Sequence, residues 1–168
     1  MNACKNNCDK VVPILLEKAE EHSIDLAKTD AKGNNGFMIA CKHNSDKVVA
    51  ILLEQIENLP MLDIHKMNKS DQNGFMLACE NNKSDKVLKM MFDKNLTFKF
   101  NFKAIDRNGR SGFILACINK REEAVKVIRD NIQNHDFNLK YKNPKNGYSA
   151  LDYYHQYWPH WPKIKLSK

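Results

Sequence analysis

The chain has 168 residues and a formal charge of +7, because 27 Lys and Arg residues outnumber 20 Asp and Glu residues. With 42% hydrophobic residues and no run of 18 apolar residues, the sequence excludes a membrane-spanning protein and a fully disordered chain. This length predicts one ordinary domain or one short repeat array. We expect no secretory signal, because the first five residues lack an apolar core.

The first 29 residues carry a pattern that returns later in the chain. Ala3-Cys4 followed by Asp9–Leu16 matches Ala40-Cys41 followed by Asp46–Leu53, 37 residues later. The pattern predicts a helix near 9–21, with Pro13 tolerated in or near its first turn. We therefore expect residues 1–29 to form a partial repeat.

Three near-identical hexamers follow at a constant spacing of 38 residues. They read Gly-Phe-Met-Ile-Ala-Cys at 36–41, Gly-Phe-Met-Leu-Ala-Cys at 74–79 and Gly-Phe-Ile-Leu-Ala-Cys at 112–117. Self-similarity with a period of this size is typical of a solenoid. We expect full repeats at about 30–67, 68–105 and 106–143, with short first helices near 36–43, 74–82 and 112–119.

Each hexamer is followed by a second helical pattern. Its apolar residues fall at i, i+3 and i+4: Val48/Ile51/Leu52, Val87/Met90/Met91 and Ala124/Val127/Ile128. This spacing predicts helices near 46–57, 85–94 and 122–133, each with one buried stripe. Ser45 and Ser84 stand at the expected N-cap positions of the first two.

The unit restarts at Gly147–Tyr154, which predicts a helix near 149–157 and a partial repeat with a cap over 144–168. The tryptophans and tyrosines of residues 153–162 should cover the open side of this last unit, and a docking tail is the alternative. At the other end Val11, Ile14 and Leu15 lack an earlier unit to pack on. We expect that edge to open first or to self-associate.

This unit resembles the ankyrin repeat, whose signature is Asp-x-x-Gly-x-Thr-Pro-Leu-His-x-Ala followed by a helix rich in Val and Leu. The last unit matches the signature best. The hairpin residues of the family stand at Asp30 and Gly33, and again at Asp106 and Gly109. The resemblance implies an all-α, ankyrin-type helix-turn-helix solenoid, with three full repeats and partial repeats at both ends.

The departures from the signature are systematic. Asn35, Asn73 and Ser111 replace the capping Thr, and they can cap a helix as Thr does. The core position of the signature Leu is held by Phe37, Phe75 and Phe113, and by Leu151 in the last unit. Glycine at the Pro position should cost some stability. The Gly-Phe-Met-x-Ala-Cys hexamer and the Lys/Asn-rich composition also resemble divergent ankyrin arrays of large amoeba-infecting DNA viruses.

The chemistry-bearing residues point to no reaction. Four of the five cysteines occupy one repeat position, which favours small buried residues in a reducing compartment over a disulfide or a zinc site, and we expect a free thiol at Cys8. The histidines lack metal-site spacing, and every glycine belongs to a repeat turn. We expect no enzymatic activity, no cofactor and no metal.

The basic charge leaves two classes of partner open. Lysine outnumbers arginine 23 to 4 and there are 20 asparagines, so much of the charge follows from A/T-rich composition. Nucleic-acid readers favour Arg, and Arg107, Arg110 and Arg121 lie in one unit. An acidic protein partner fits the charge equally well, and sequence-nonspecific nucleic-acid binding is the alternative.

The ankyrin resemblance implies a protein-interaction scaffold in an intracellular, cytoplasmic setting, host cytoplasm included. Its partners would meet the hairpin tips and the concave face of the first helices. Carried onto this chain, the contact residues are Lys32, Asn34, Lys42, His43, Gln72, Glu80, Asn81, Arg107, Arg110, Ile118, Asn119, Lys145 and Tyr148.

Three further expectations concern this array. Because Asp71 stands where other hairpins have glycine, we expect the hairpin of that unit to be distorted. Alanine at Arg107 and Arg110 should weaken binding to an acidic partner. The missing half-unit at the start also fits a fragment of a longer ankyrin protein.

Overall fold

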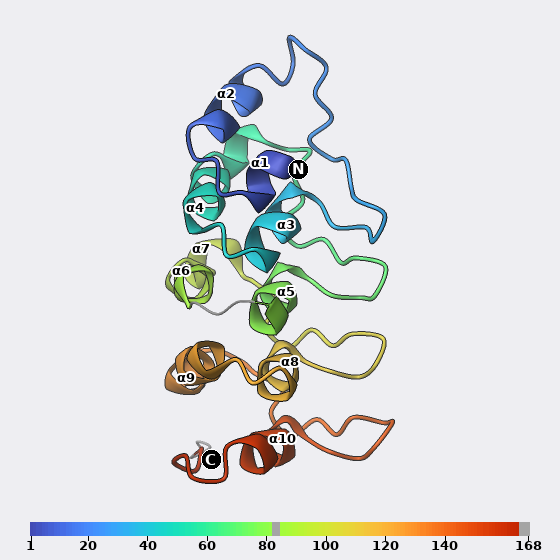
Figure 1. Ribbon diagram of the computed structural model, residues 1–168, viewed down its shortest axis with the longest axis vertical. Coiled ribbons are helices and arrows are strands. Elements are labelled where there is room, and N and C mark those ends of the chain that lie inside the picture. Colours follow the sequence, from blue (N-terminus) through green and yellow to red (C-terminus); the bar gives the residue numbers. More distant parts are fainter. Residues whose placement is uncertain (82–84, 165–168) are drawn as a thin grey trace.

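The computed structural model describes residues 1–81 and 85–164. Within these ranges it contains ten α-helices, one 3-10 helix and no β-strand, which confirms the predicted all-α helix-turn-helix solenoid. The helices stack in two columns along the long axis of the molecule, and the hairpins project from the side of the first column (Figure 1). None of the described helices has both the length and the apolar character needed to cross a membrane.

The first column holds the hexamer helices and their counterparts at the two ends: α1 (Asn2–Lys5), α3 (Gly36–Lys42), α5 (Gly74–Asn81), α8 (Gly112–Ile118) and α10 (Ala150–Tyr157). The second column holds the amphipathic helices and two short turns: α2 (Val11–Glu17), α4 (Asp46–Glu54), η1 (Ile56–Asn58), α6 (Lys86–Asp93), α7 (Asn95–Phe98) and α9 (Glu122–Asn131). The first helices pack mainly on each other, α3 on α5 and α5 on α8.

Several second helices are shorter than the sequence predicts. The helix expected over 9–21 covers only Val11–Glu17, and the helix expected over 46–57 ends at Glu54 and continues as η1. The turn α7 was not predicted; it ends at Lys99, which adopts a left-handed conformation with φ 48°. Residue 82, the last of the helix expected over 74–82, and Ser84 lie outside the described residues.

The first helices begin with the caps that the sequence predicts. The side-chain oxygens of Asn35, Asn73 and Ser111 accept hydrogen bonds from the backbone N–H three residues later, at 2.9–3.3 Å. Ser149 caps α10 in the same way and forms a capping box with Asp152. Each cap satisfies a backbone donor that the first turn leaves without an intrahelical partner.

The second helix α4 is capped from the preceding unit. Ser45 occupies the N-cap position, but its hydroxyl donates to the carbonyl of Lys5 instead of accepting from the helix. Asn7 accepts from the N–H of Val48 at 3.2 Å and donates to the carboxylate of Asp46 at 3.0 Å. Ser45 therefore stands at the N-cap position, as predicted, but the side chain that caps α4 is that of Asn7 from the preceding unit.

The core repeats a contact between a phenylalanine and a glycine of the next unit. Phe37, Phe75 and Phe113 are fully buried, as predicted. An added Cβ at Gly74 would lie 2.9 Å from Cε1 of Phe37, and one at Gly112 would lie 2.6 Å from Cε1 of Phe75. Glycine thus replaces the family's proline because the large ring of the preceding unit fills the space that a side chain would need.

The two ends of the stack are covered differently. At the C-terminal end Tyr154 is fully buried, stacks on Phe113 and donates its hydroxyl hydrogen bond to the carbonyl of Pro162 at 2.7 Å. Leu151, predicted as core, is only partly buried because no later unit covers it. At the N-terminal end Ile14 is 59% exposed, so self-association through that edge stays a prediction.

Candidate functional site

Four hairpins lie side by side along one edge of the molecule, at 30–34, 68–72, 106–110 and 143–148 (Figure 1). In the first three, a side-chain oxygen of the opening residue accepts backbone N–H bonds from the residues two and four positions later, at 2.8–3.0 Å. These opening residues are Asp30, Asn68 and Asp106. The chain therefore builds the same turn three times from short polar side chains that bond their own backbone.

The fifth residue of each of these hairpins closes the turn with its side chain. Asn34 donates to Asp30 at 2.8 Å, and Gln72 accepts from Asn68 at 3.3 Å. Arg110 donates two hydrogen bonds to one carboxylate oxygen of Asp106, at 2.9 and 2.6 Å. Asn34 and Gln72 are 2% and 8% exposed. Both side chains also bond outside their own hairpins: Asn34 accepts from Asn68 of the next hairpin at 2.9 Å, and Gln72 donates to Glu80 at 3.0 Å. Little of either side chain is left for a partner, and their role in binding stays a prediction.

The hairpin of Asp71 keeps the common geometry. Asp71 has φ 58°, close to the values of 84° and 71° at Gly33 and Gly109. Its N–H donates to the carbonyl of Asn68 at 2.9 Å, as Gly33 does to Asp30. The expected distortion is therefore wrong, because Asp is among the few residues that adopt the left-handed region at modest cost.

Hydrogen bonds connect each hairpin to the next. The N–H of Lys69 donates to the carbonyl of Lys32 at 3.0 Å, and that of Arg107 donates to the carbonyl of Ser70 at 3.1 Å. From the last hairpin, the side chains of Asn143 and Lys145 donate to the carbonyl and side-chain oxygens of Asn108, at 2.9 and 2.6 Å. The four tips form one hydrogen-bonded edge, so their side chains are positioned before any partner arrives.

This edge is basic. We define the hairpin face as residues 30–34, 63–72, 101–110 and 140–148, which hold nine Lys and Arg residues and four Asp residues. Of these acids, Asp106 has a side chain that is 1% exposed and is paired with Arg110. Apart from this pair, the hairpin face still holds eight basic and three acidic side chains, so a partner would meet a basic surface.

Four of the predicted contacts are exposed on this face: Lys32, Arg107, Lys145 and Tyr148. Arg107 forms an ion pair with Asp71 at 3.2 Å, and both side chains are at least half exposed, so this pair contributes little stability and can yield to a partner. Tyr148 is 49% exposed and contacts the ring of Tyr153 edge-on.

Lys69 is a candidate that the sequence prediction missed. It is exposed and lies 38 residues before Arg107, and Lys145 lies 38 residues after Arg107. The three basic side chains therefore share one repeat position on successive hairpins. The period of the hexamers, applied to Arg107, would have found it.

The remaining predicted residues lie where the first helices end: Lys42, His43, Glu80, Asn81, Ile118 and Asn119. Most other residues of α3, α5 and α8 are buried, so these three helices reach the surface mainly at their C-terminal ends. Asn81 and Asn119 use their side chains to bond the carbonyls of Leu77 and Leu115. Partial burial and the ammonium groups of Lys5 and Lys42 lower the pKa of His43, which favours its neutral form.

Acid should destabilise the first hairpin through Asp30. Burial pushes the pKa of Asp30 up, but the hydrogen bonds from Asn34 and Lys32 outweigh it, and the pKa lies below its ordinary value. A carboxylate with a lowered folded-state pKa adds stability above its unfolded pKa, and that stability is lost as pH falls through the folded pKa. We expect Asp30→Asn to reduce the fall in melting temperature between pH 6 and pH 3.

Circular dichroism melts at steps of half a pH unit measure this effect. The substitution copies Asn68, which makes the same backbone bonds in the next hairpin, so the fold should be retained. Identical pH curves for the two proteins would show that Asp30 does not contribute.

No cluster of three or more His, Cys, Asp or Glu side chains in residues 1–81 and 85–164 is arranged to hold a metal ion. The three cysteines of the hexamers are buried, and burial raises the pKa of Cys117 to about 12.

A family model described as "Ankyrin repeats (3 copies)" matches residues 1–103. Curated protein sequences give no match to the chain. No matching sequence supports the resemblance of the hexamer to the viral ankyrin arrays.

Proposed function

Because this chain belongs to the ankyrin-repeat family, whose repeats are generally protein–protein interaction modules, we propose that its hairpin face binds an acidic segment of a partner protein. The observation that carries the proposal is the basic edge itself: hairpins linked tip to tip by hydrogen bonds, with Lys69, Arg107 and Lys145 at one repeat position. A preformed surface of one charge attracts an oppositely charged segment and sets its orientation.

A charge-reversal experiment tests this proposal. The probe is a fluorescent 20-residue polyglutamate peptide, and the variant is Arg107→Glu with Lys145→Glu. We expect its affinity to fall by about tenfold or more at low salt, because two attractive contacts become repulsive. Fluorescence anisotropy gives the dissociation constants.

The matched control is Lys10→Glu with Lys94→Glu, which changes the net charge equally at exposed positions of the second column. A general effect of net charge would weaken both variants alike and would count against a specific face. The proposal requires the hairpin variant to lose several times more affinity than the control.

Nucleic acid is the other polyanion that this face could attract. Fluorescent single-stranded and duplex oligonucleotides in the same assay distinguish the two classes. Binding to nucleic acid should weaken linearly in log salt, with a slope set by the number of phosphates contacted. Tight oligonucleotide binding without polyglutamate binding would replace the proposed partner.

Ankyrin-repeat proteins are typically non-enzymatic scaffolds, and the proposal assigns this chain no reaction. We further propose an intracellular setting, which the five free cysteines support because free thiols persist in reducing compartments.

A further inference from the structure

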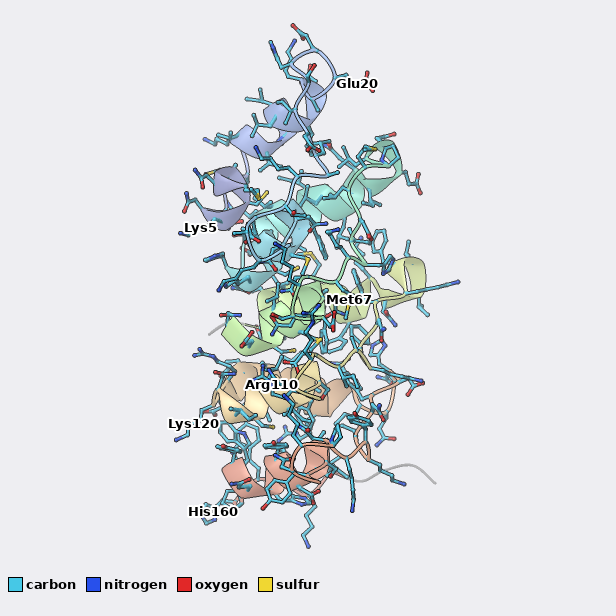
Figure 2. The ribbon with its side chains drawn as sticks, turned by 90° about the vertical axis from the view of Figure 1, so that its right-hand side faces the viewer. Lys5, Glu20, Met67, Arg110, Lys120 and His160 are labelled. Atoms are coloured by element: carbon cyan, nitrogen blue, oxygen red, sulfur yellow. The ribbon has the colours of Figure 1, made fainter. Side chains whose placement is uncertain are left out.

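A second candidate binding surface is a groove that carries acidic residues. A groove of about 450 Å³ separates the chain after α2 from the turn after η1, at the end of the molecule where Glu20 lies (Figure 2). Leu16, Ala19, Leu26 and Leu59 line it, and Met61, 64% exposed, stands at its edge. No residue of the hairpin face lines the groove.

Acidic residues lie in the groove and in the chain just before its second lining segment, 58–61. Residues 16–26 and 54–61 hold six acidic residues and one lysine: Glu17, Glu20, Glu21, Asp25, Glu54, Glu57 and Lys18. All six acidic residues are exposed, and the lysine is paired with Glu21 at 2.7 Å. This local excess of negative charge stands out in a chain whose formal charge is +7.

We propose that this groove binds a basic amphipathic helix of a partner protein. The volume matches the roughly 300–1,000 Å³ of small-molecule sites, so it would take a few apolar side chains from one face of a helix. The carboxylates of Glu17, Glu20 and Asp25 line the same groove and would pair with Lys or Arg beside those side chains. Met61 has a flexible, polarisable side chain that adapts to such an apolar face.

The charges decide between possible occupants. An acidic helix would meet Glu17, Glu20 and Asp25, which carry charges of its own sign, and a neutral helix would leave these residues unpaired. The helix-in-groove mode requires apolar anchors at i, i+3, i+4 and i+7, so charge alone is not sufficient. With a basic hairpin face and an acidic groove, one chain would hold two partners of opposite charge. This inference does not depend on the function proposed for the hairpin face.

Three synthetic 14-residue peptides test the inference. The first has Leu at i, i+3, i+4 and i+7 and Lys elsewhere, the second has Glu in place of Lys, and the third has the composition of the first in scrambled order. We expect the first peptide to bind at least about tenfold more tightly than either of the others. It alone offers both a row of apolar side chains for the groove and positive charges for the acidic residues. Fluorescence anisotropy and amide shifts in 16–26 and 58–61 report the site.

Protein variants make the test specific. Glu17→Lys with Glu20→Lys should reduce affinity for the first peptide by about tenfold, whereas Asp93→Lys with Asp130→Lys, an equal charge change elsewhere, should not. Met61→Gln, at an exposed position that should not affect folding, should weaken binding through the apolar contact alone. Equal binding of all three peptides, or equal loss in both charge variants, would overturn the inference. So would a dimer, seen by sedimentation, that Met61→Gln abolishes, because the groove would then hold a second copy.

Discussion

Replacing Gly112 with alanine is expected to lower the free energy of unfolding by roughly 1–3 kcal/mol, as overpacking of a core typically does. The new Cβ would lie 2.6 Å from Cε1 of Phe75 and 3.1 Å from Sγ of Cys79. Phe75 cannot turn away freely, because its ring also packs against Phe102, with 4.8 Å between the ring centroids. The loss should appear although alanine favours helices more than glycine does. Urea denaturation followed by circular dichroism measures it.

The same substitution at Gly36 is the matched control. There the nearest atom to an added Cβ is Sγ of the half-buried Cys4, at 3.3 Å. Gly36→Ala should therefore be neutral or slightly stabilising. In the Gly112→Ala protein, Phe75→Leu should recover part of the loss, since it removes the ring that clashes and restores the residue of the family signature. Equal losses for Gly36→Ala and Gly112→Ala would contradict the proposed pairing of Phe with Gly.

Asp106→Ala is expected to lower the free energy of unfolding by roughly 1–3 kcal/mol, because it leaves partly buried donors without their charged acceptor. The carboxylate of Asp106 accepts from the backbone N–H groups of Asn108 and Arg110 and twice from the guanidinium of Arg110. The third hairpin should loosen, and binding to the acidic probe should weaken with it. Chemical denaturation gives the first quantity and anisotropy the second.

Asp106→Asn separates the turn from the charge. Asn68 holds the same position in the preceding hairpin and makes the same two backbone bonds. The asparagine variant should therefore lose less than half as much stability as the alanine variant. If both variants were as stable as the wild type, the polar turn would not be what holds the hairpin.

Local sequence patterns predicted where the first helices begin. The first helices begin at Gly36, Gly74 and Gly112, as the hexamers indicate, because a cap, a turn and a run of buried residues all fall within a few positions. The cap of α4 could not be predicted in this way. Asn7 and Val48 are 41 residues apart, and only the stacking of two units brings them together. The short elements η1 and α7 each follow a second helix, but they differ in type and length and left no periodic signal in the sequence.

The candidate site was predicted in part. The predicted Arg107 and Lys145 lie exposed on the hairpin face, whereas Arg110 is fixed by the carboxylate of Asp106. The pair of polar side chains that closes a hairpin differs between the units. It is Asn with Asp in the first hairpin, Gln with Asn in the second and Arg with Asp in the third. Alanine at Arg110 would disturb the hairpin as well as its charge. Reversal at Arg107 and Lys145 is therefore the cleaner test of binding than alanine at Arg107 and Arg110.

The claim that the basic hairpin edge is the partner-binding surface can be tested without knowing the partner. Amide NMR spectra of the labelled protein, titrated with the polyglutamate peptide at low salt, locate the contact residue by residue. We predict that the largest amide shifts fall within 30–34, 63–72, 101–110 and 140–148. The amide signals of α4, α6 and α9 should stay close to their positions in the spectrum of the free protein. Shifts spread evenly over all exposed lysines, or concentrated on the second column, would contradict this assignment.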